Sequence, residues 1–96
     1  MKSVIFREKD IPEIGLRPDA IILLTKGGKG LCVILEANNN EPPEYLTKKV
    51  NVWRGWADAL SWLSELFHYK IPSFEIITTG ETVEGTINFN RFLEAL

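Results

Sequence analysis

The sequence has 96 residues, of which 45% are hydrophobic and 25% are charged. This length predicts one small domain, and the hydrophobic fraction excludes an intrinsically disordered chain. Without an apolar run of about 18 residues, the sequence predicts no membrane span. The charged residues that follow Met1 do not fit a secretory signal. Cys32 is the only cysteine, which excludes an internal disulfide and favours a cytoplasmic protein.

The net charge of −2 argues against a general binder of duplex nucleic acid, because such proteins usually carry a clear basic excess. This net charge is compatible with a protein that holds its ligand by aromatic stacking beside a local basic patch. Lysines and acids are frequent, and amides are few outside residues 38–40, which favours a thermophilic source.

The N-terminal third predicts a strand, a loop and a hairpin. Residues 2–7 have the β-branched and aromatic content of a short strand. Residues 10–18 contain two prolines and a glycine, so we expect a loop whose hydrophobic side chains pack on the core. Residues 19–36 hold two apolar runs around Gly27 and Gly28, which predicts a hairpin with a two-residue turn. The unbroken apolar character of both runs predicts central strands.

The middle of the chain predicts a loop and one long helix. Residues 37–44 are polar and contain prolines, which indicates a loop. Residues 46–50 are interpreted as a short edge strand or the lead into the helix, and their alternation slightly favours extended chain. Asn51 is a suitable N-cap for a helix over residues 52–69, and Pro72 prevents the helix from continuing.

The predicted helix holds all three tryptophans of the chain. At about 100° per residue, a broad apolar face contains Val52, Trp56, Ala59, Leu60, Leu63, Leu66 and Phe67. Trp62 and Tyr69 lie outside this face, on a polar flank. Two aromatic rings on such a flank need a partner, which can be another domain, another subunit or a flat ligand such as a nucleobase.

The remaining elements complete an α+β prediction. Residues 73–79 predict a further strand, followed by a turn at Gly80, and residues 88–96 predict a short amphipathic C-terminal helix. We therefore expect a small single domain of about four mostly antiparallel strands, packed against the long tryptophan-rich helix and the C-terminal helix. Cys32 is interpreted as a core residue and His68 as a solvated residue at the helix end.

Aromatic and basic residues form the first candidate site. Single-stranded nucleic acid is held by aromatic faces that stack bases, beside cations that follow the backbone. Trp53, Trp62 and Tyr69 are the candidates for stacking. The candidates for phosphate contacts are Arg7, Lys26, Lys29, Lys48, Lys49 and Arg54. The alternative is that Trp53 and Trp56 are core residues, while Trp62 and Tyr69 form a subunit contact.

A pair of acids forms the second candidate site. A turn at Gly27 and Gly28 places Asp19 opposite Glu36, and like charges destabilise a sheet unless a cation or solvent separates them. With the proline before Asp19 and with Asn38 after Glu36, the pattern resembles the core of the PD-(D/E)xK nucleases. That resemblance implies Mg²⁺ bound by the two acids. Asn38 replaces the family lysine, for which Lys48 or Lys49 could substitute. The alternative is two solvated acids at strand ends.

The order of elements and the run Gly-Trp-Ala-x-Ala-Leu-x-Trp-Leu over residues 55–63 resemble the DNA-binding domain of archaeal ThermoDBP-related proteins. The resemblance implies a single-stranded DNA-binding protein without an OB-fold that works as a homo-oligomer. We therefore expect a non-enzymatic binder of single-stranded DNA, or of RNA, acting as a homodimer or homotetramer without a cofactor. A small Mg²⁺-dependent nuclease and a protein-assembly module are the alternatives.

Overall fold

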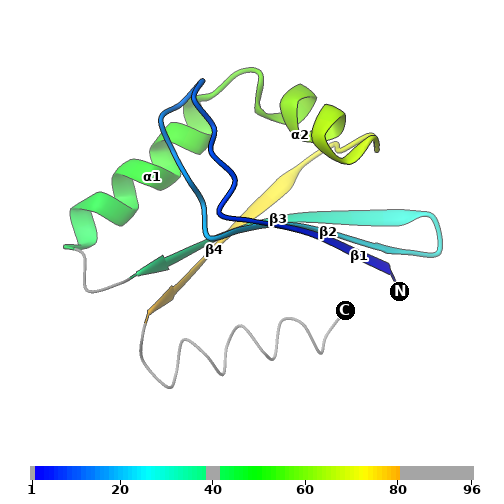
Figure 1. Ribbon diagram of the computed structural model, residues 1–96, viewed down its shortest axis with the longest axis horizontal. Helices are drawn as coiled ribbons and strands as arrows, with labels where there is room; N and C mark the ends of the chain where they lie inside the picture. Colours follow the sequence, from blue (N-terminus) through cyan, green and yellow to red (C-terminus); the bar gives the residue numbers. More distant parts are fainter. Residues whose placement is uncertain (1, 39–41, 81–96) are drawn as a thin grey trace.

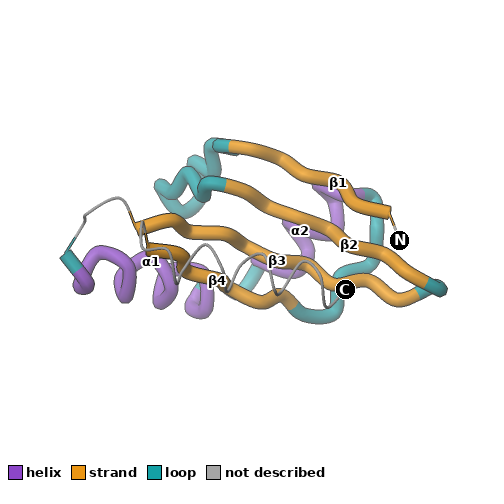
Figure 2. The backbone as a smooth tube through the Cα atoms, turned by 90° about the horizontal axis from the view of Figure 1, so that it is seen from below, coloured by secondary structure: helices purple, strands orange, loops and turns teal. Residues whose placement is uncertain are grey.

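In the part of the chain that the structure describes, four strands form one mixed sheet, and two helices lie between the third and the fourth strand along the sequence. The computed structural model describes residues 2–38 and 42–80. The elements are β1 (Lys2–Arg7), β2 (Ala20–Lys26), β3 (Lys29–Asn38), α1 (Pro43–Gly55), α2 (Ala59–Phe67) and β4 (Phe74–Gly80). The strands lie side by side in the order β1-β2-β3-β4, as Figure 2 shows. The predicted strands and hairpin are therefore confirmed.

The β2–β3 hairpin has the register that its glycines predict. Gly27 and Gly28 have φ values of 59° and 80°, which only glycine adopts at low cost at both positions of a two-residue turn. Ala20 lies opposite Leu35, and Lys26 lies opposite Lys29. The register is set by local turn chemistry, so the sequence was sufficient to predict it.

The connection from β3 to β4 explains why the sheet is mixed. β1 with β2 and β2 with β3 are antiparallel, whereas β3 and β4 are parallel because α1 and α2 carry the chain back across the sheet. Both helices cover the same face of the sheet (Figure 1). In the described part of the chain, neither helix is long and apolar enough to cross a membrane. The α+β class with a mostly antiparallel sheet is confirmed, and the helix predicted over residues 88–96 lies outside the described residues.

The single helix predicted over residues 52–69 is wrong at its start. α1 begins at Pro43, so Asn51 lies inside a helix and is not its N-cap, and residues 46–50 are helical, not extended. Proline is well suited to the first turn of a helix, because the N–H that it lacks has no partner there in any case. The prolines interpreted as loop residues therefore mark the beginning of α1.

The predicted helix is also wrong in its middle, where the chain breaks between α1 and α2. Trp56 has an extended backbone, with φ of −84° and ψ of 103°. Trp62 N donates to the Asp58 carbonyl at 2.9 Å as α2 begins. α2 ends before His68, whose φ of 51° is left-handed, and this exposed residue closes the helix as predicted.

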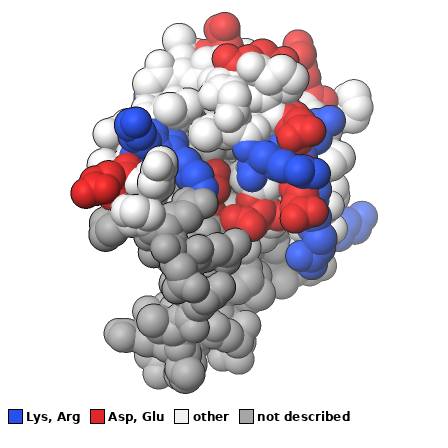
Figure 3. All heavy atoms as spheres, turned by 60° about the vertical axis from the view of Figure 1, so that its left-hand side comes forward, with Lys and Arg blue, Asp and Glu red and all other residues white. Residues whose placement is uncertain are grey.

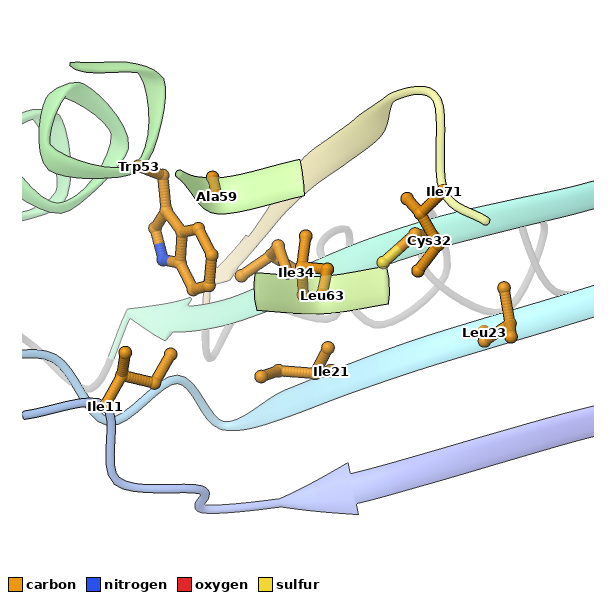
Figure 4. Packing of buried hydrophobic residues seen from close by; sticks show 9 residues of the cluster. All are labelled: Ile11, Ile21, Leu23, Cys32, Ile34, Trp53, Ala59, Leu63 and Ile71. Atoms are coloured by element: carbon orange, nitrogen blue, oxygen red, sulfur yellow. The ribbon is translucent and has the colours of Figure 1, made fainter. Parts of the chain in front are cut away.

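The main core lies between the helices and the sheet. Trp53 of α1, Leu63 of α2 and Ile34 of β3 are fully buried in it, and Figure 4 shows their side chains gathered over the sheet. Ile11 of the loop before β2 is buried in the same cluster, and Ile14 and Leu16 pack against it, so the expected contact of this loop with the core is confirmed. A second buried cluster on the opposite face of the sheet contains Ala20, Ile22, Leu24 and Val33.

Replacement of Leu63 tests the α2 contact with the sheet. Leu63→Ala removes a fully buried side chain, and we expect it to lower the free energy of unfolding by about 2–5 kcal/mol. Leu60→Ala, on the exposed side of the same helix, is the matched control and changes that energy by less than about 1 kcal/mol. Urea titration monitored by tryptophan fluorescence measures both. Equal losses in the two variants would contradict the helix orientation.

Candidate nucleic-acid interface

A cleft with basic and aromatic walls lies beside the hairpin turn. Its volume is about 380 Å³, and it is open to solvent. We call it the hairpin-tip cleft, and it is lined by Gly28, Lys29, Gly30, Tyr69, Lys70 and Pro72. The hairpin therefore contributes one wall, and the segment between α2 and β4 contributes the other.

The position of Tyr69 is set by the end of α2. After the left-handed turn at His68, Tyr69 N donates to the Ser64 carbonyl at 3.1 Å. Ser64 Oγ accepts a hydrogen bond from Ile71 N at 3.0 Å, which holds the following segment against the helix. The Tyr69 hydroxyl donates to the Gly28 carbonyl at 3.3 Å, so the ring is tied to the hairpin at its far end.

Gly30 supports the Tyr69 ring. A Cβ atom at Gly30 would lie 2.7 Å from Tyr69 Cε1, a separation that real Cβ atoms do not show. The ring therefore occupies the space that any other residue at position 30 would fill. Tyr69 is half-buried, with one side on the strand and the remainder lining the cleft.

Lysines surround the hairpin tip. Lys26 and Lys29 face each other across the turn, and like charges in directly opposite positions destabilise a sheet. Lys2 and Lys26 line a second depression of about 220 Å³ that shares Gly28 with the hairpin-tip cleft. No ion pair involves these lysines or Lys70 among the described residues. An anion bound at the tip would relieve the repulsion between Lys26 and Lys29.

Trp53 does not belong to an accessible surface. Its side chain is 0% exposed, and its ring lies 5.7 Å from that of Phe74 and 5.9 Å from that of Trp56. Protein atoms thus occupy the ring faces that a base would need for stacking. The expected stacking role of Trp53 does not fit this position, and the alternative of a core residue does.

Trp62 is half-buried and belongs to the same aromatic layer. Its ring centroid lies 5.6 Å from that of Trp56, and it packs against the main core. The predicted stripe of Trp62 and Tyr69 required one continuous helix. Because Tyr69 follows the left-handed residue at the end of α2, the two rings do not share a helix flank.

The other predicted phosphate contacts lie away from the hairpin tip. Lys48 and Arg54 are exposed on α1, and Arg7 is the last residue of β1, opposite Ala20. Figure 1 places α1 at the end of the sheet remote from the hairpin turn. Figure 3 brings that side forward and shows basic and acidic side chains interspersed on it. Among the predicted nucleic-acid contacts that the structure describes, only Tyr69, Lys26 and Lys29 lie at the hairpin tip.

The predicted acid pair lies at this remote end of the sheet. The Glu36 side chain is buried on β3, and Lys49 Nζ of α1 lies 3.9 Å from its Oε2 atom. Asp19 precedes β2, and its N–H donates to the Leu35 carbonyl at 3.0 Å. Asn38 is the last residue of β3. No group of three or more His, Cys, Asp or Glu side chains within residues 2–38 and 42–80 could hold a metal ion.

Cys32 is a core residue, as predicted. It is buried on β3 and lies in the main cluster with Leu23 and Leu63. Burial raises the pKa of the Cys32 thiol to about 12, because the apolar surroundings disfavour the thiolate. A thiol that stays protonated at neutral pH is a poor nucleophile.

Lys70, Lys2 and the supporting glycine at position 30 were not identified from the sequence. The sequence feature that indicates Lys70 as a site residue is its position directly after Tyr69, an aromatic residue for which the sequence shows no packing partner. Nothing in the sequence places Lys2 at the hairpin tip until the register of β1 against β2 is known, which sets Lys2 opposite Thr25.

We compared the chain with protein-family models, curated proteins and solved structures, and none of these comparisons gave a match. The resemblance to archaeal single-stranded DNA-binding proteins therefore stays a prediction.

The contact of Gly30 with Tyr69 is open to a double-mutant test. Gly30→Ala forces the ring away, and we expect it to lower the free energy of unfolding by about 1–3 kcal/mol. In a Tyr69→Ala background the same change should have little effect, because the clash is gone. Gly55→Ala, where an added Cβ meets no atom within 4 Å, is the control and should be neutral or stabilising. Urea titration measures all variants. An unchanged effect of Gly30→Ala without the tyrosine would refute the contact.

Proposed function

We propose that this protein is a non-enzymatic, sequence-tolerant binder of single-stranded DNA, and that the hairpin tip is its binding surface. The observation that carries the proposal is the hairpin-tip cleft, which Tyr69 lines together with Lys29 and Lys70. An aromatic ring beside cations is the combination that holds unpaired bases and their phosphates.

The chemistry of the cleft favours a single strand over a duplex. A base can stack on Tyr69 only if it is unpaired or splayed out, because paired bases cover each other's faces. Lys26 and Lys29 add positive charge at the turn, where their mutual repulsion favours a bound phosphate. The overall charge of −2 disfavours binding along an extended duplex. The affinity therefore depends on a local patch and not on the charge of the whole protein.

Removal of two lysines tests the location of the site. The Lys29→Ala/Lys70→Ala variant loses two phosphate contacts, so we expect weaker binding and a salt dependence of log K reduced by about 1.4. Lys48→Ala/Arg54→Ala removes the same charge from exposed positions on α1 and should bind as the parent does. Fluorescence anisotropy of a labelled single strand in EDTA, with a matched duplex and a matched RNA alongside, measures both. Loss of binding only in the α1 variant would move the site to α1, and equal binding of the duplex would contradict the proposal.

Tyr69 tests stacking in the same assay. Tyr69→Ala should weaken binding of the single strand by the value of one stacked base, about 1–3 kcal/mol. Tyr69→Phe keeps the ring but loses the hydrogen bond to Gly28, so it should bind almost as the parent does. If Tyr69→Ala binds as tightly as the parent, stacking on this ring is refuted.

A second candidate, a small metal-dependent nuclease, is favoured by one observation. Lys49 stands 3.9 Å from Glu36, where it could substitute for the lysine that Asn38 replaces in the resembling family. Glu36 is only 1% exposed, however, and its ion pair with Lys49 offsets its charge without a metal. Mg²⁺ would have to open this pair before it could bind.

Divalent-metal titration separates the two candidates. Under the nuclease candidate, Mg²⁺ or Mn²⁺ binds the parent more tightly than the Asp19→Asn variant, and a labelled oligonucleotide is cleaved only with metal. Calorimetry and gel electrophoresis measure these outcomes. Equal metal binding by both proteins would exclude this candidate. Absence of nucleic-acid binding with and without metal would leave a protein-assembly module.

A further inference from the structure

We propose that a second copy of this chain pairs with β1, strand against strand and antiparallel, so that two sheets become one. β1 is an edge strand, and among the described residues only β2 pairs with it. Val4 and Ile5, at its centre, are 49% and 45% exposed, which is unusual for large apolar side chains in mid-strand. This interface does not depend on nucleic-acid binding.

The edge of β1 lacks the features that usually prevent pairing. Exposed edge strands are commonly protected by a proline, a bulge or a charge in the middle of the strand. β1 has the sequence Lys-Ser-Val-Ile-Phe-Arg, with charges at its two ends only. Its pairing with β2 runs without interruption from Lys2 to Arg7.

The hairpin turn determines which backbone groups of β1 face outward. A two-residue turn is closed by a hydrogen-bonded pair, here Lys26 and Lys29, so the backbone groups of Lys26 point to β3. By alternation, the backbone groups of Thr25 point to β1 and bond to those of Lys2. The hydrogen bond from Glu8 N to the Asp19 carbonyl, at 3.2 Å, fits the same alternation, in which the backbone groups of the even-numbered residues point to β2. The backbone groups of Ser3, Ile5 and Arg7 therefore point away from β2.

This alternation restricts the register in which two copies of β1 can pair symmetrically. In an antiparallel ladder, two residues that lie opposite each other either exchange backbone hydrogen bonds or exchange none. The residues of β1 whose backbone groups point away from β2 must therefore lie opposite residues of the same kind in the partner. A register centred on Ile5 places Ser3 opposite the partner's Arg7 and uses every outward group, with about six new hydrogen bonds. A register centred on Val4 leaves Arg7 without a partner among the residues of β1 and is less favourable.

The side chains favour the same register. It also brings Lys2 close to the partner's Glu8, the residue with φ of 48° that directly follows β1, twice by symmetry, so the terminal charges attract. Val4 then lies opposite the partner's Phe6 on the face that carries the helices, beside the contact of Phe6 with Phe67. Ile5 meets the partner's Ile5 on the opposite face. The two exposed apolar residues are thus both covered by one symmetric contact.

The mass of the protein in solution tests the interface. We expect the parent to change from monomer to dimer with concentration in light scattering coupled to size exclusion. Ile5→Arg should remain monomeric over the same range, because it places two like charges at the symmetry axis. Val52→Arg, a comparably exposed apolar position on α1, is the control and should dimerise. A parent that stays monomeric, or an Ile5→Arg variant that dimerises normally, would overturn the proposal.

A charge exchange tests the register without altering the apolar centre. Lys2→Glu and Glu8→Lys should each weaken the dimer about fivefold, and the double variant Lys2→Glu/Glu8→Lys should regain the affinity of the parent. Analytical ultracentrifugation measures the dissociation constants. Additive losses in the double variant would exclude this register.

Discussion

The burial of Trp53 between α1 and the sheet is the contact on which the rest of the fold depends. This ring touches Trp56 in the break between the helices and Phe74 at the beginning of β4, so it joins the centre of the crossover to its end. Loss of a buried tryptophan side chain typically costs about 3–5 kcal/mol, a large share of the stability of a domain of this size. After the break next to Trp53, α2 leads the chain back toward the hairpin (Figure 1). The location of Tyr69 at the hairpin tip follows from this path.

The strands were predictable because their signals are local. The apolar runs of β2 and β3 and the two glycines between them determine the hairpin and its register within about twenty residues. The helices were predicted less well for a physical reason. The apolar periodicity continues through residues 56–58, and no proline interrupts it, so the sequence alone indicates one helix. At the break, the Trp56 ring lies 5.9 Å from that of Trp53 and 5.6 Å from that of Trp62 and packs against the main core, and the apolar periodicity does not reveal this packing.

The candidate site was predictable only in part. Tyr69, Lys26 and Lys29 were selected as an aromatic and two cations, yet their proximity depends on a hydrogen bond between residues 41 positions apart. Amphipathic patterns could not separate Trp53, which is buried, from Tyr69, which lines a cleft, because both are aromatic residues within the same apolar segment. The role of Gly30 depends on the Tyr69 ring that lies against it, and the sequence does not give the position of that ring. A glycine in a strand interior indicates the close approach of another group but does not identify that group.

The two ends of the sheet differ in how their charged side chains are paired. This difference separates the proposed binding surface from a contact that lies within the protein. At the α1 end, Lys49 faces the buried Glu36, so the positive charge of Lys49 is paired within the protein. At the hairpin tip, Lys26 and Lys29 face each other, so positive charge is left for a ligand. Antiparallel pairing through β1 would place the two hairpin tips of a dimer at opposite ends of one continuous sheet. A short oligonucleotide would then occupy one tip, whereas a strand long enough to reach both would bind more tightly, because its second contact is intramolecular. The dependence of affinity on strand length would thus connect the edge strand to the cleft, although the two lie on different parts of the sheet.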